Sequence, residues 1–291
     1  MDTPTDAGDC AHPVLSCGTK GAAGPSAVHL PTAAVAQVPI TAVAPDPAAR
    51  YVIDTALART APRHIHLCNA YTLALADTDP ALRAVLRQPD AVNFPDGQGV
   101  VWAGRLVHRH LDLPADRVYG PDLFLNAFRA GQAHSLRHYL LGSTRDVLDR
   151  LAAELRIRFP EAMIVGTEAP PFREPSTEER ESQARRIAAS GAHVVWVGLG
   201  TPKQDHEVAR LAALHPAVYV AVGAAFDFVS GNKPQAPGWM QRHGLEWLFR
   251  LCSEPRRLWR RVVWGHPRFI WAACQGARTG QGTKGTKGVR E

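Results

Sequence analysis

One carboxylate stands where the catalytic groups of α/β proteins are commonly found. Asp96 follows a short apolar run, residues 91–94, and is itself followed by Gly97 and Gly99. A carboxylate at the carboxyl end of a strand, beside glycines that let a substrate approach, is well placed to act as a general base. An Asp-Gly turn that Asp96 merely starts would have the same sequence, so the pattern alone leaves both interpretations open.

A second stretch predicts an anion-binding turn. The apolar run 194–197 is typical of a strand buried on both faces of a parallel sheet. The signals after it are Gly198 and Gly200 for a tight turn, Thr201 as N-cap, Pro202 at N1 and Gln204 at N3 of a capping box. Unpaired N–H groups at such a helix start bind anions, and Gln204 could either contact a ligand or only close the cap.

A third stretch repeats the theme of short strand, glycine turn and helix. Residues 117–119 are expected to form the strand, Gly120 the turn and Pro121 the N1 position. Asp122 would then lie in the first helical turn, where the helix dipole favours a carboxylate. Arg117 could reach a phosphate at the strand end, or could simply be solvated.

Several other chemistries lack their motifs. The sequence has no Walker loop, no complete Gly-x-Gly-x-x-Gly and no Gly-x-Ser-x-Gly elbow. The five cysteines show neither close pairs nor zinc spacing, which favours a reducing cytosol. Asp77 and Asp79 resemble a metal-binding Asp-x-Asp, but Asp79 before Pro80 is better explained as a helix N-cap.

The expected elements alternate between strand and helix. Strands are expected at 64–68, 91–94, 138–141, 162–165, 194–197 and 218–222, with helices between them and helix caps at Ser143 and Ser176. This alternation with short turns predicts an α/β fold, a doubly wound, mostly parallel, Rossmann-like sheet.

Composition divides the chain into four segments. Residues 1–50 are rich in Ala, Pro, Gly and Thr and are expected to be a disordered extension, followed by the α/β core at 51–234. Residues 235–274 are expected to form a basic helical appendage, and 275–291 a disordered tail. From Trp239 onward eleven Lys and Arg residues face three Glu residues, although the net charge of the whole chain is only +6. This surplus indicates a phosphate-rich partner or an anionic membrane, and no apolar run is long enough to span a bilayer.

Four motifs, taken together and in order, resemble the WecG/TagA/CpsF glycosyltransferases, glycosyltransferase family 26. They are Asp96-Gly97-x-Gly99; Arg117-Val118-x-Gly120-x-Asp122; Val197-Gly198-Leu199-Gly200-x-Pro202-Lys203-Gln204; and Gly244-Leu245-Glu246-Trp247-x-x-Arg250-x-x-x-Glu254-Pro255-Arg256-Arg257. The resemblance covers roughly residues 50–265. One departure is Leu67, where members of the family usually carry Thr.

The resemblance implies an inverting transfer, without a metal or other cofactor, from a UDP-sugar to a polyprenyl-diphosphate-linked sugar in cell-surface polysaccharide synthesis. The sugar would be N-acetylmannosamine, its uronic acid or a related hexose. By similarity Asp96 would be the general base, with Asn69, Arg117 and Gln204 in the substrate pocket. The other motif residues carried over as substrate-binding are Gly120, Asp122, Gly198, Gly200 and Lys203. Arg250, Arg257 and Arg260 would close over the diphosphate.

The C-terminal pattern agrees with these roles. Spacings of seven and three would place Arg250, Arg257 and Arg260 on one face of a helix, where guanidinium groups can neutralise phosphate oxygens. The many aromatic residues around them favour a helix lying on an anionic membrane, on the cytoplasmic face of the cell membrane. A non-catalytic UDP-sugar or polyprenyl-phosphate binding protein of the same fold is the alternative. A nucleic-acid partner is not expected, and the resemblance allows a homo-oligomer.

Overall fold

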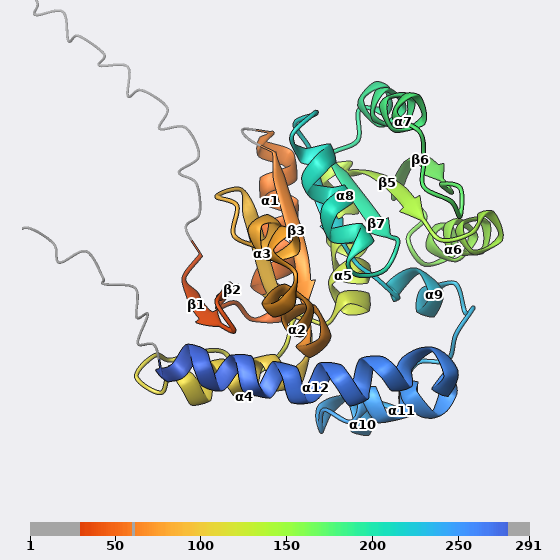
Figure 1. Cartoon of the computed structure of the whole chain (residues 1–291). Coiled ribbons are helices and arrows are strands. Elements are labelled where there is room, and N and C mark those ends of the chain that lie inside the picture. Colours follow the sequence, from red (N-terminus) through yellow and green to blue (C-terminus); the bar gives the residue numbers. More distant parts are fainter. Residues whose placement is uncertain (1–29, 60–61, 279–291) are drawn as a thin grey trace, which may run out of the picture.

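A six-stranded parallel sheet forms the centre of the molecule. In the computed structural model, which describes residues 30–59 and 62–278, its strand order is β4-β3-β8-β7-β5-β6. The strands are β3 (Arg63–Cys68), β4 (Ala91–Pro95), β5 (Arg137–Gly142), β6 (Met163–Glu168), β7 (Val194–Gly198) and β8 (Val218–Ala221). The strands expected at 64–68, 91–94, 138–141, 162–165, 194–197 and 218–222 are present, and the doubly wound α/β fold is confirmed (Figure 1).

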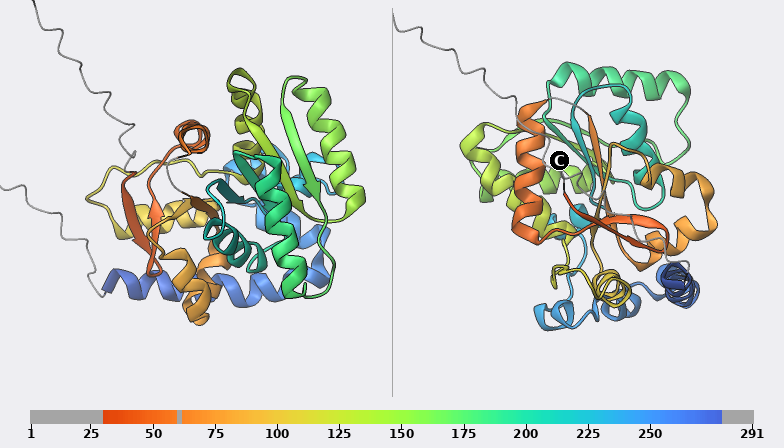
Figure 2. Two further views of the ribbon diagram at one scale, coloured as in Figure 1. Left: turned by 90° about the horizontal axis from the view of Figure 1, so that it is seen from above. Right: turned by 90° about the vertical axis from the view of Figure 1, so that its left-hand side faces the viewer.

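Helices cover both faces of the sheet (Figure 2). On one face a core cluster joins the strands to α1 (Pro45–Ala58), α5 (Gly120–Gly131), α6 (Arg145–Arg158) and α9 (Ala225–Val229). On the other face, α7 (Thr177–Ser190) and α8 (Lys203–Ala212) pack on the strands, while α2 (Ala70–Thr78) and α3 (Pro80–Leu86) connect β3 to β4. The remaining helical elements before the C-terminal segment are α4 (Gln98–Val107) and a short 3-10 turn, η1 (Gln132–His134).

Strand β7 shows why continuous apolar runs form the inner strands. Trp196 packs in the cluster of one face, whereas Val195 and Val197 pack in the cluster of the other, and all three are fully buried. Successive side chains of a strand point to opposite faces, so a strand covered on both sides needs apolar residues at every position.

Two predicted helix caps are confirmed. The Asp79 side chain accepts hydrogen bonds from the backbone N–H groups of Ala81 and Leu82, as expected of an N-cap. Ser176 and Glu179 form the capping box of α7.

Two local predictions are wrong. The cap of α6 is Thr144, whose Oγ1 accepts from Val147, and not Ser143, whose φ of 59° places it in the left-handed region. Residues 117–119 do not form a strand of the sheet, although Tyr119 is extended. The backbone N–H of Val118 donates a hydrogen bond to the carbonyl of Pro95 at the end of β4 (2.8 Å), so the segment contacts the end of this strand without forming a ladder with it.

Part of the expected N-terminal extension is ordered, contrary to the prediction. Strands β1 (Thr32–Val35) and β2 (Val38–Thr41) form an antiparallel hairpin, and helix α1 already begins at Pro45. Residues of β1 alternate between exposed and buried, whereas three of the four residues of β2 are buried. The buried residues of the hairpin pack in a cluster with α2, α3, α4 and α12. Pro39 fits because each strand of a two-stranded hairpin is an edge. Residues 1–29, for which disorder is expected, lie outside the described residues.

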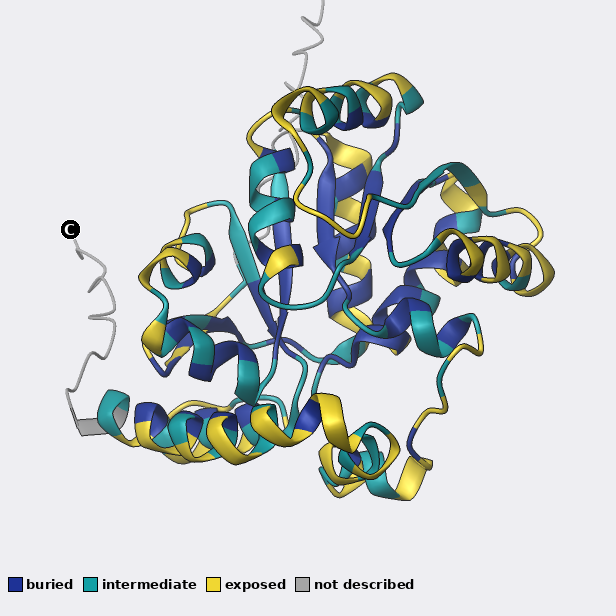
Figure 3. Cartoon of the chain, turned by 45° about the vertical axis from the view of Figure 1, so that its right-hand side comes forward, coloured by how far each residue is buried: buried dark blue, intermediate teal, exposed yellow. Residues whose placement is uncertain are grey.

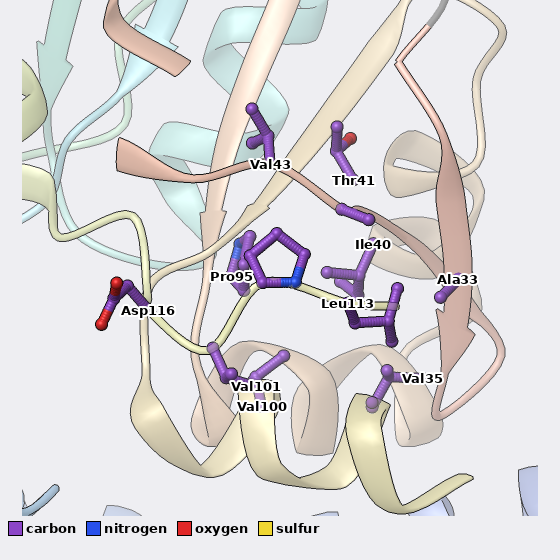
Figure 4. Close-up of a pocket in the computed structure, with 13 residues that line it drawn as sticks. Ala33, Val35, Ile40, Thr41, Val43, Pro95, Val100, Val101, Leu113 and Asp116 are labelled. Atoms are coloured by element: carbon purple, nitrogen blue, oxygen red, sulfur yellow. The ribbon is translucent and has the colours of Figure 1, made fainter. Parts of the chain in front are cut away.

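A small apolar cavity lies between this hairpin, α4 and the loop before α5 (Figure 4). Its volume of about 30 Å³ is close to that of one water molecule and far below the hundreds of Å³ that a sugar nucleotide needs. We therefore assign it to packing of the hairpin and not to substrate binding.

The basic C-terminal segment consists of three helices at the carboxyl ends of the strands. These are α10 (Gly238–Arg242), α11 (Glu246–Ser253) and α12 (Pro255–Arg278), and α12 runs beside α2 and α4 (Figure 1). Buried and exposed positions alternate along α12 (Figure 3). Residues 275–278 are helical, although a disordered tail is predicted to begin at 275, and 279–291 lie outside the described residues. No helix in the described part of the chain is long and apolar enough to cross a membrane.

Candidate functional site

Asp96 lies directly after β4, at the carboxyl edge of the sheet. Its backbone N–H donates to the carbonyl of Cys68 at the end of β3 (2.9 Å), which fixes the turn. Its carboxylate Oδ1 accepts a hydrogen bond from the backbone N–H of Gly120 (3.1 Å), the first residue of helix α5. The carboxylate is therefore held at a helix N-terminus and is more than a turn-forming side chain.

The surroundings make Asp96 an unusually basic carboxylate. Burial raises its pKa from the usual 3.8 to about 6. Arg117 opposes this rise, Glu246 adds to it, and the Gly120 hydrogen bond and Arg250 oppose it. The side chain is enclosed by protein atoms but retains some accessible surface. A carboxylate with a pKa near neutrality that a ligand can reach is suited to accept a proton.

Arg117 joins this site to the C-terminal helices. Its Nη1 donates to the backbone carbonyl of Asp96 (3.3 Å), and its Nη2 donates to Glu246 Oε2 on α11 (2.7 Å). The guanidinium also stacks over the ring of Tyr119, 4.1 Å from its centroid. Tyr119 donates its hydroxyl proton to Glu246 Oε1 (3.3 Å) and accepts from Gln235 Nε2 (3.0 Å).

Sequence reasoning assigned no role to Tyr119, Gln235 or Glu246. Glu246 stands within one of the family motifs, which was the available signal. The buried network that it forms depends on contacts between residues more than a hundred positions apart.

Asn69 lies beside Asp96 and caps helix α2. Its Oδ1 accepts from the backbone N–H groups of Tyr71 and Thr72 (3.0 and 3.1 Å). A Cβ added to Gly97 would lie 3.4 Å from Asn69 Cβ, so the turns after β3 and β4 are in contact. The cap orients the Asn69 amide at the edge where Asp96 is found.

Gly120 is closely packed at the start of α5. A Cβ at this position would lie 2.9 Å from Leu67 Cδ1 and 3.8 Å from Asp96 Oδ1. Leu67 is buried beneath this glycine, so the residue that departs from the family pattern packs against the start of α5.

The turn after β7 differs from the predicted capping box. Helix α8 starts at Lys203 with no side-chain cap, and Thr201 does not act as N-cap. Instead the buried Gln204 accepts a hydrogen bond from the N–H of Gly200 through Oε1 (2.9 Å), across a turn that contains a cis Thr201–Pro202 peptide. The left-handed φ of 79° at Gly200 allows this turn. Gln204 thus shapes the loop, and its Nε2 faces the turn after β8, since a Cβ at Gly223 would lie 3.6 Å away.

A buried polar chain supports the start of α8. His66 Nδ1 lies 2.8 Å from Asp205 Oδ1, and His66 Nε2 lies 2.7 Å from His64 Nδ1. Burial lowers the pKa of His64 to about 4, so it is neutral at physiological pH. These residues anchor helix α8 to β3 next to Gln204.

The remaining predicted site residues are distributed unevenly. Arg250 lies on α11 above the ring of Phe228, 5.6 Å from its centroid. Its positive charge opposes the rise in the pKa of Asp96. Arg257 is exposed and pairs with Glu254 (2.6 Å), and Arg260 is exposed and lies over Trp259. The prediction that the three arginines share one helix face is wrong, because α11 ends at Ser253 and a separate helix, α12, begins at Pro255.

Lys203 and Asp122 are exposed in the first turns of α8 and α5.

The site therefore has two parts on one edge of the sheet. Asp96, Asn69 and Arg117 surround the ends of β4 and β3, whereas Gly198, Gly200 and Gln204 follow β7. The end of β8 lies between the two parts. Three strand spacings of about 4.8 Å separate β4 from β7. An elongated ligand could contact both parts at once.

Metal ligands are not gathered at this edge. Within the ranges 30–59 and 62–278, no group of three His, Cys, Asp or Glu side chains could hold a metal ion. Asp77, the other carboxylate of the Asp-x-Asp pattern, forms an ion pair with Arg268 of α12.

Comparison with known proteins found one matching family model and similar relatives from two Bacillus species. The model of the Glycosyl transferase WecG/TagA/CpsF family matches residues 33–282. An N-acetylglucosaminyldiphosphoundecaprenol N-acetyl-beta-D-mannosaminyltransferase of Bacillus spizizenii is 31% identical over 201 residues, 69% of this chain and 74% of the relative. A protein of the same name from Bacillus subtilis is 32% identical over 171 residues, 58% of this chain and 63% of the relative.

Proposed function

The chain belongs to the WecG/TagA/CpsF family of glycosyltransferases, and on that premise we propose that it moves a sugar from a UDP-sugar to a sugar carried on a polyprenyl diphosphate. The relatives are named for transfer of N-acetylmannosamine to N-acetylglucosaminyldiphosphoundecaprenol. We extend the lipid-linked acceptor to this chain. The observation that carries the proposal is the basic carboxylate of Asp96 beside Asn69, Arg117 and the arginine-bearing α11.

In the proposed reaction, Asp96 accepts the proton of the acceptor hydroxyl. The hydroxyl oxygen then attacks the anomeric carbon, and the bond from this carbon to the UDP oxygen breaks. A single displacement of this kind inverts the configuration at the anomeric carbon. The carboxylate is ionised above a pH of about 6, so it is ready to accept a proton at neutral pH.

The departing diphosphate needs positive charge. We assign this role to Arg250, whose charge reaches Asp96 in the docked arrangement, and to Arg257 and Arg260 after a rearrangement of their side chains. Arginine remains protonated and can form paired hydrogen bonds with phosphate oxygens, so it can replace a metal in this role. Gln204 and the loop from Gly198 to Lys203 would hold another part of the donor at the far end of the edge.

The lipid-linked acceptor would approach along the C-terminal helices. A groove of about 410 Å³ lies between α2 and α12, lined by Tyr71, Leu75 and Trp264 together with Arg260 and Arg261. Tyr71, which lines this groove, follows Asn69 by two positions in the chain. Large apolar side chains are also exposed along these helices and α4, namely Trp102, Leu106, Trp239, Trp247, Leu248, Trp259, Val263, Trp264, Ile270 and Trp271. Such aromatic and basic surfaces bind anionic bilayers, which supports a peripheral location on the cytoplasmic face of the membrane.

The test is UDP release from a panel of UDP-sugars, with a polyprenyl-diphosphate-GlcNAc analogue in detergent and with EDTA present. Acceptor-dependent release from one donor is expected, and it would identify the sugar and establish metal independence. The Asp96→Asn variant should release no UDP under the same conditions. UDP binding by the unchanged protein without release from any donor would contradict the proposed reaction for this acceptor.

A further inference from the structure

The guanidinium of Arg117 is shared between two distant parts of the chain. One nitrogen donates to Glu246 on α11 and another to the backbone carbonyl of Asp96, so neither hydrogen bond goes to the Asp96 carboxylate. Within the described part of the chain, that carboxylate accepts one hydrogen bond, from the N–H of Gly120. Arg117, the cation with the largest effect on Asp96, is therefore paired with the carboxylate of Glu246.

Glu246 is built into this arrangement. It is the first residue of α11, its residue surface is only 8% exposed, and both of its carboxylate oxygens have partners, Arg117 and Tyr119. A buried carboxylate is tolerated only when it is paired and hydrogen-bonded. Docking of α11 on the sheet thus brings Glu246 to Arg117, and undocking would leave Arg117 without this partner.

We propose that Glu246 is a positioning residue that couples the docking of α11 to the ability of Asp96 to accept a proton. By holding Arg117, Glu246 prevents an ion pair between Arg117 and the Asp96 carboxylate. When α11 leaves, the guanidinium, already next to Asp96, pairs with its carboxylate and weakens it as a base. This inference rests on the proposed role of Asp96 as general base.

The charges around Asp96 agree with this coupling. The charged or titratable groups that face it are Cys68 at the end of β3, Arg117 and Tyr119 before α5, and Glu246 and Arg250 on α11. Burial makes the largest contribution to the raised pKa of Asp96, and Glu246 is the carboxylate that adds to it. Removing the charge of Glu246 eliminates this contribution and also frees Arg117, and both effects lower the pKa of Asp96.

The experiment compares the pH dependence of kcat for the full chain and for its Glu246→Gln variant. The unchanged enzyme should lose activity below a pH of about 6. In Glu246→Gln this acidic limb should move down by about one pH unit, and the plateau above pH 7 should fall several-fold because a weaker base accepts the proton. Glu246→Asp, which retains the charge, should restore the position of the limb.

Asp77→Asn is the matched control. Asp77 is also a buried carboxylate that pairs with an arginine of the C-terminal segment, Arg268, but it does not face Asp96. If Glu246 only fastened the helices, both variants would change KM or the plateau and leave the limb in place. That result, or coinciding limbs for the unchanged enzyme and Glu246→Gln, would overturn the inference.

A second readout does not need activity. The stability difference between Asp96→Asn and its parent should depend on pH over a lower range in the Glu246→Gln background than in the unchanged background. An identical pH range in both backgrounds would overturn the inference. Failure of the proposed function is recognised separately, because then the unchanged protein transfers no sugar at any pH while this stability comparison can still be made.

Discussion

Replacing Asp96 with Asn is expected to stabilise the fold at neutral pH while abolishing sugar transfer. The native carboxyl group titrates at about 6, chiefly because burial disfavours its charged form, whereas the usual value is 3.8. As pH rises from 3.8 to 6, the unfolded chain releases this proton before the folded chain does. The folded state therefore loses stability over that window. An Asn side chain, similar in shape and always neutral, avoids this loss.

The size of the effect follows from the two pKa values. A difference of this size corresponds to ~3 kcal/mol at pH values above both. Asp96 retains some contact with solvent, so we expect about 2 kcal/mol in practice. For a chain of this length such a gain corresponds to a rise in Tm of roughly 2–4 °C.

The assay is urea unfolding of the unchanged protein and of Asp96→Asn at pH 5 and pH 8. The stability advantage of the variant should be largest at pH 8 and fall to about half at pH 5, because the carboxyl group is then mostly protonated in the folded state. An advantage that does not change with pH, or a variant less stable than the parent at pH 8, would refute the argument that Asp96 is a strained, basic carboxylate. Exposed Asp149→Asn, on the outer surface of α6, is the control for a simple change in net charge.

Three further outcomes are expected. Asn69→Ser should retain the cap of α2, whereas Asn69→Ala should lose it and lower the free energy of unfolding by about 1 kcal/mol, measured by thermal unfolding. If Asn69 also binds substrate, both variants should lose activity. Activity retained in the Ser variant would limit the role of Asn69 to capping. Gly198→Ala should destabilise the fold by about 1–3 kcal/mol, because the added Cβ would lie 2.7 Å from Phe226 Cδ2; an unchanged Tm would show that the ring can move aside. Removal of residues from 236 onward should leave a folded sheet with little or no transferase activity. Two of the three core clusters contain no residue of that segment, whereas the third loses Phe269 and its neighbours. Circular dichroism and UDP release measure the two properties, and undiminished turnover would exclude the arginines from the site.

Local signals in the sequence were sufficient for the strands of the sheet and for the helix starts at Asp79 and Ser176. Inner strands such as β7 are apolar at every position, and caps such as Asp79 and Ser176 act within a few residues of their own helix. The hairpin was missed because its two-residue turn uses Ala36 and Gln37 in the left-handed region, with neither Gly nor Asn to indicate it. Its stability comes from packing on helices that are distant in the sequence.

By itself the sequence determined the α/β class, the position of Asp96 at a strand end, and the concentration of arginine and tryptophan after the sheet. These properties follow from the periodicity of apolar residues and from the local composition, because both act on the backbone and its solvation over only a few residues. Only the tertiary structure decided that Arg117 is held by Glu246, that Gln204 shapes the loop after β7, and that the three arginines lie on two helices. The basicity of Asp96 was also decided there, because it depends on burial and on charges brought together from the end of β4, the segment before α5 and helix α11.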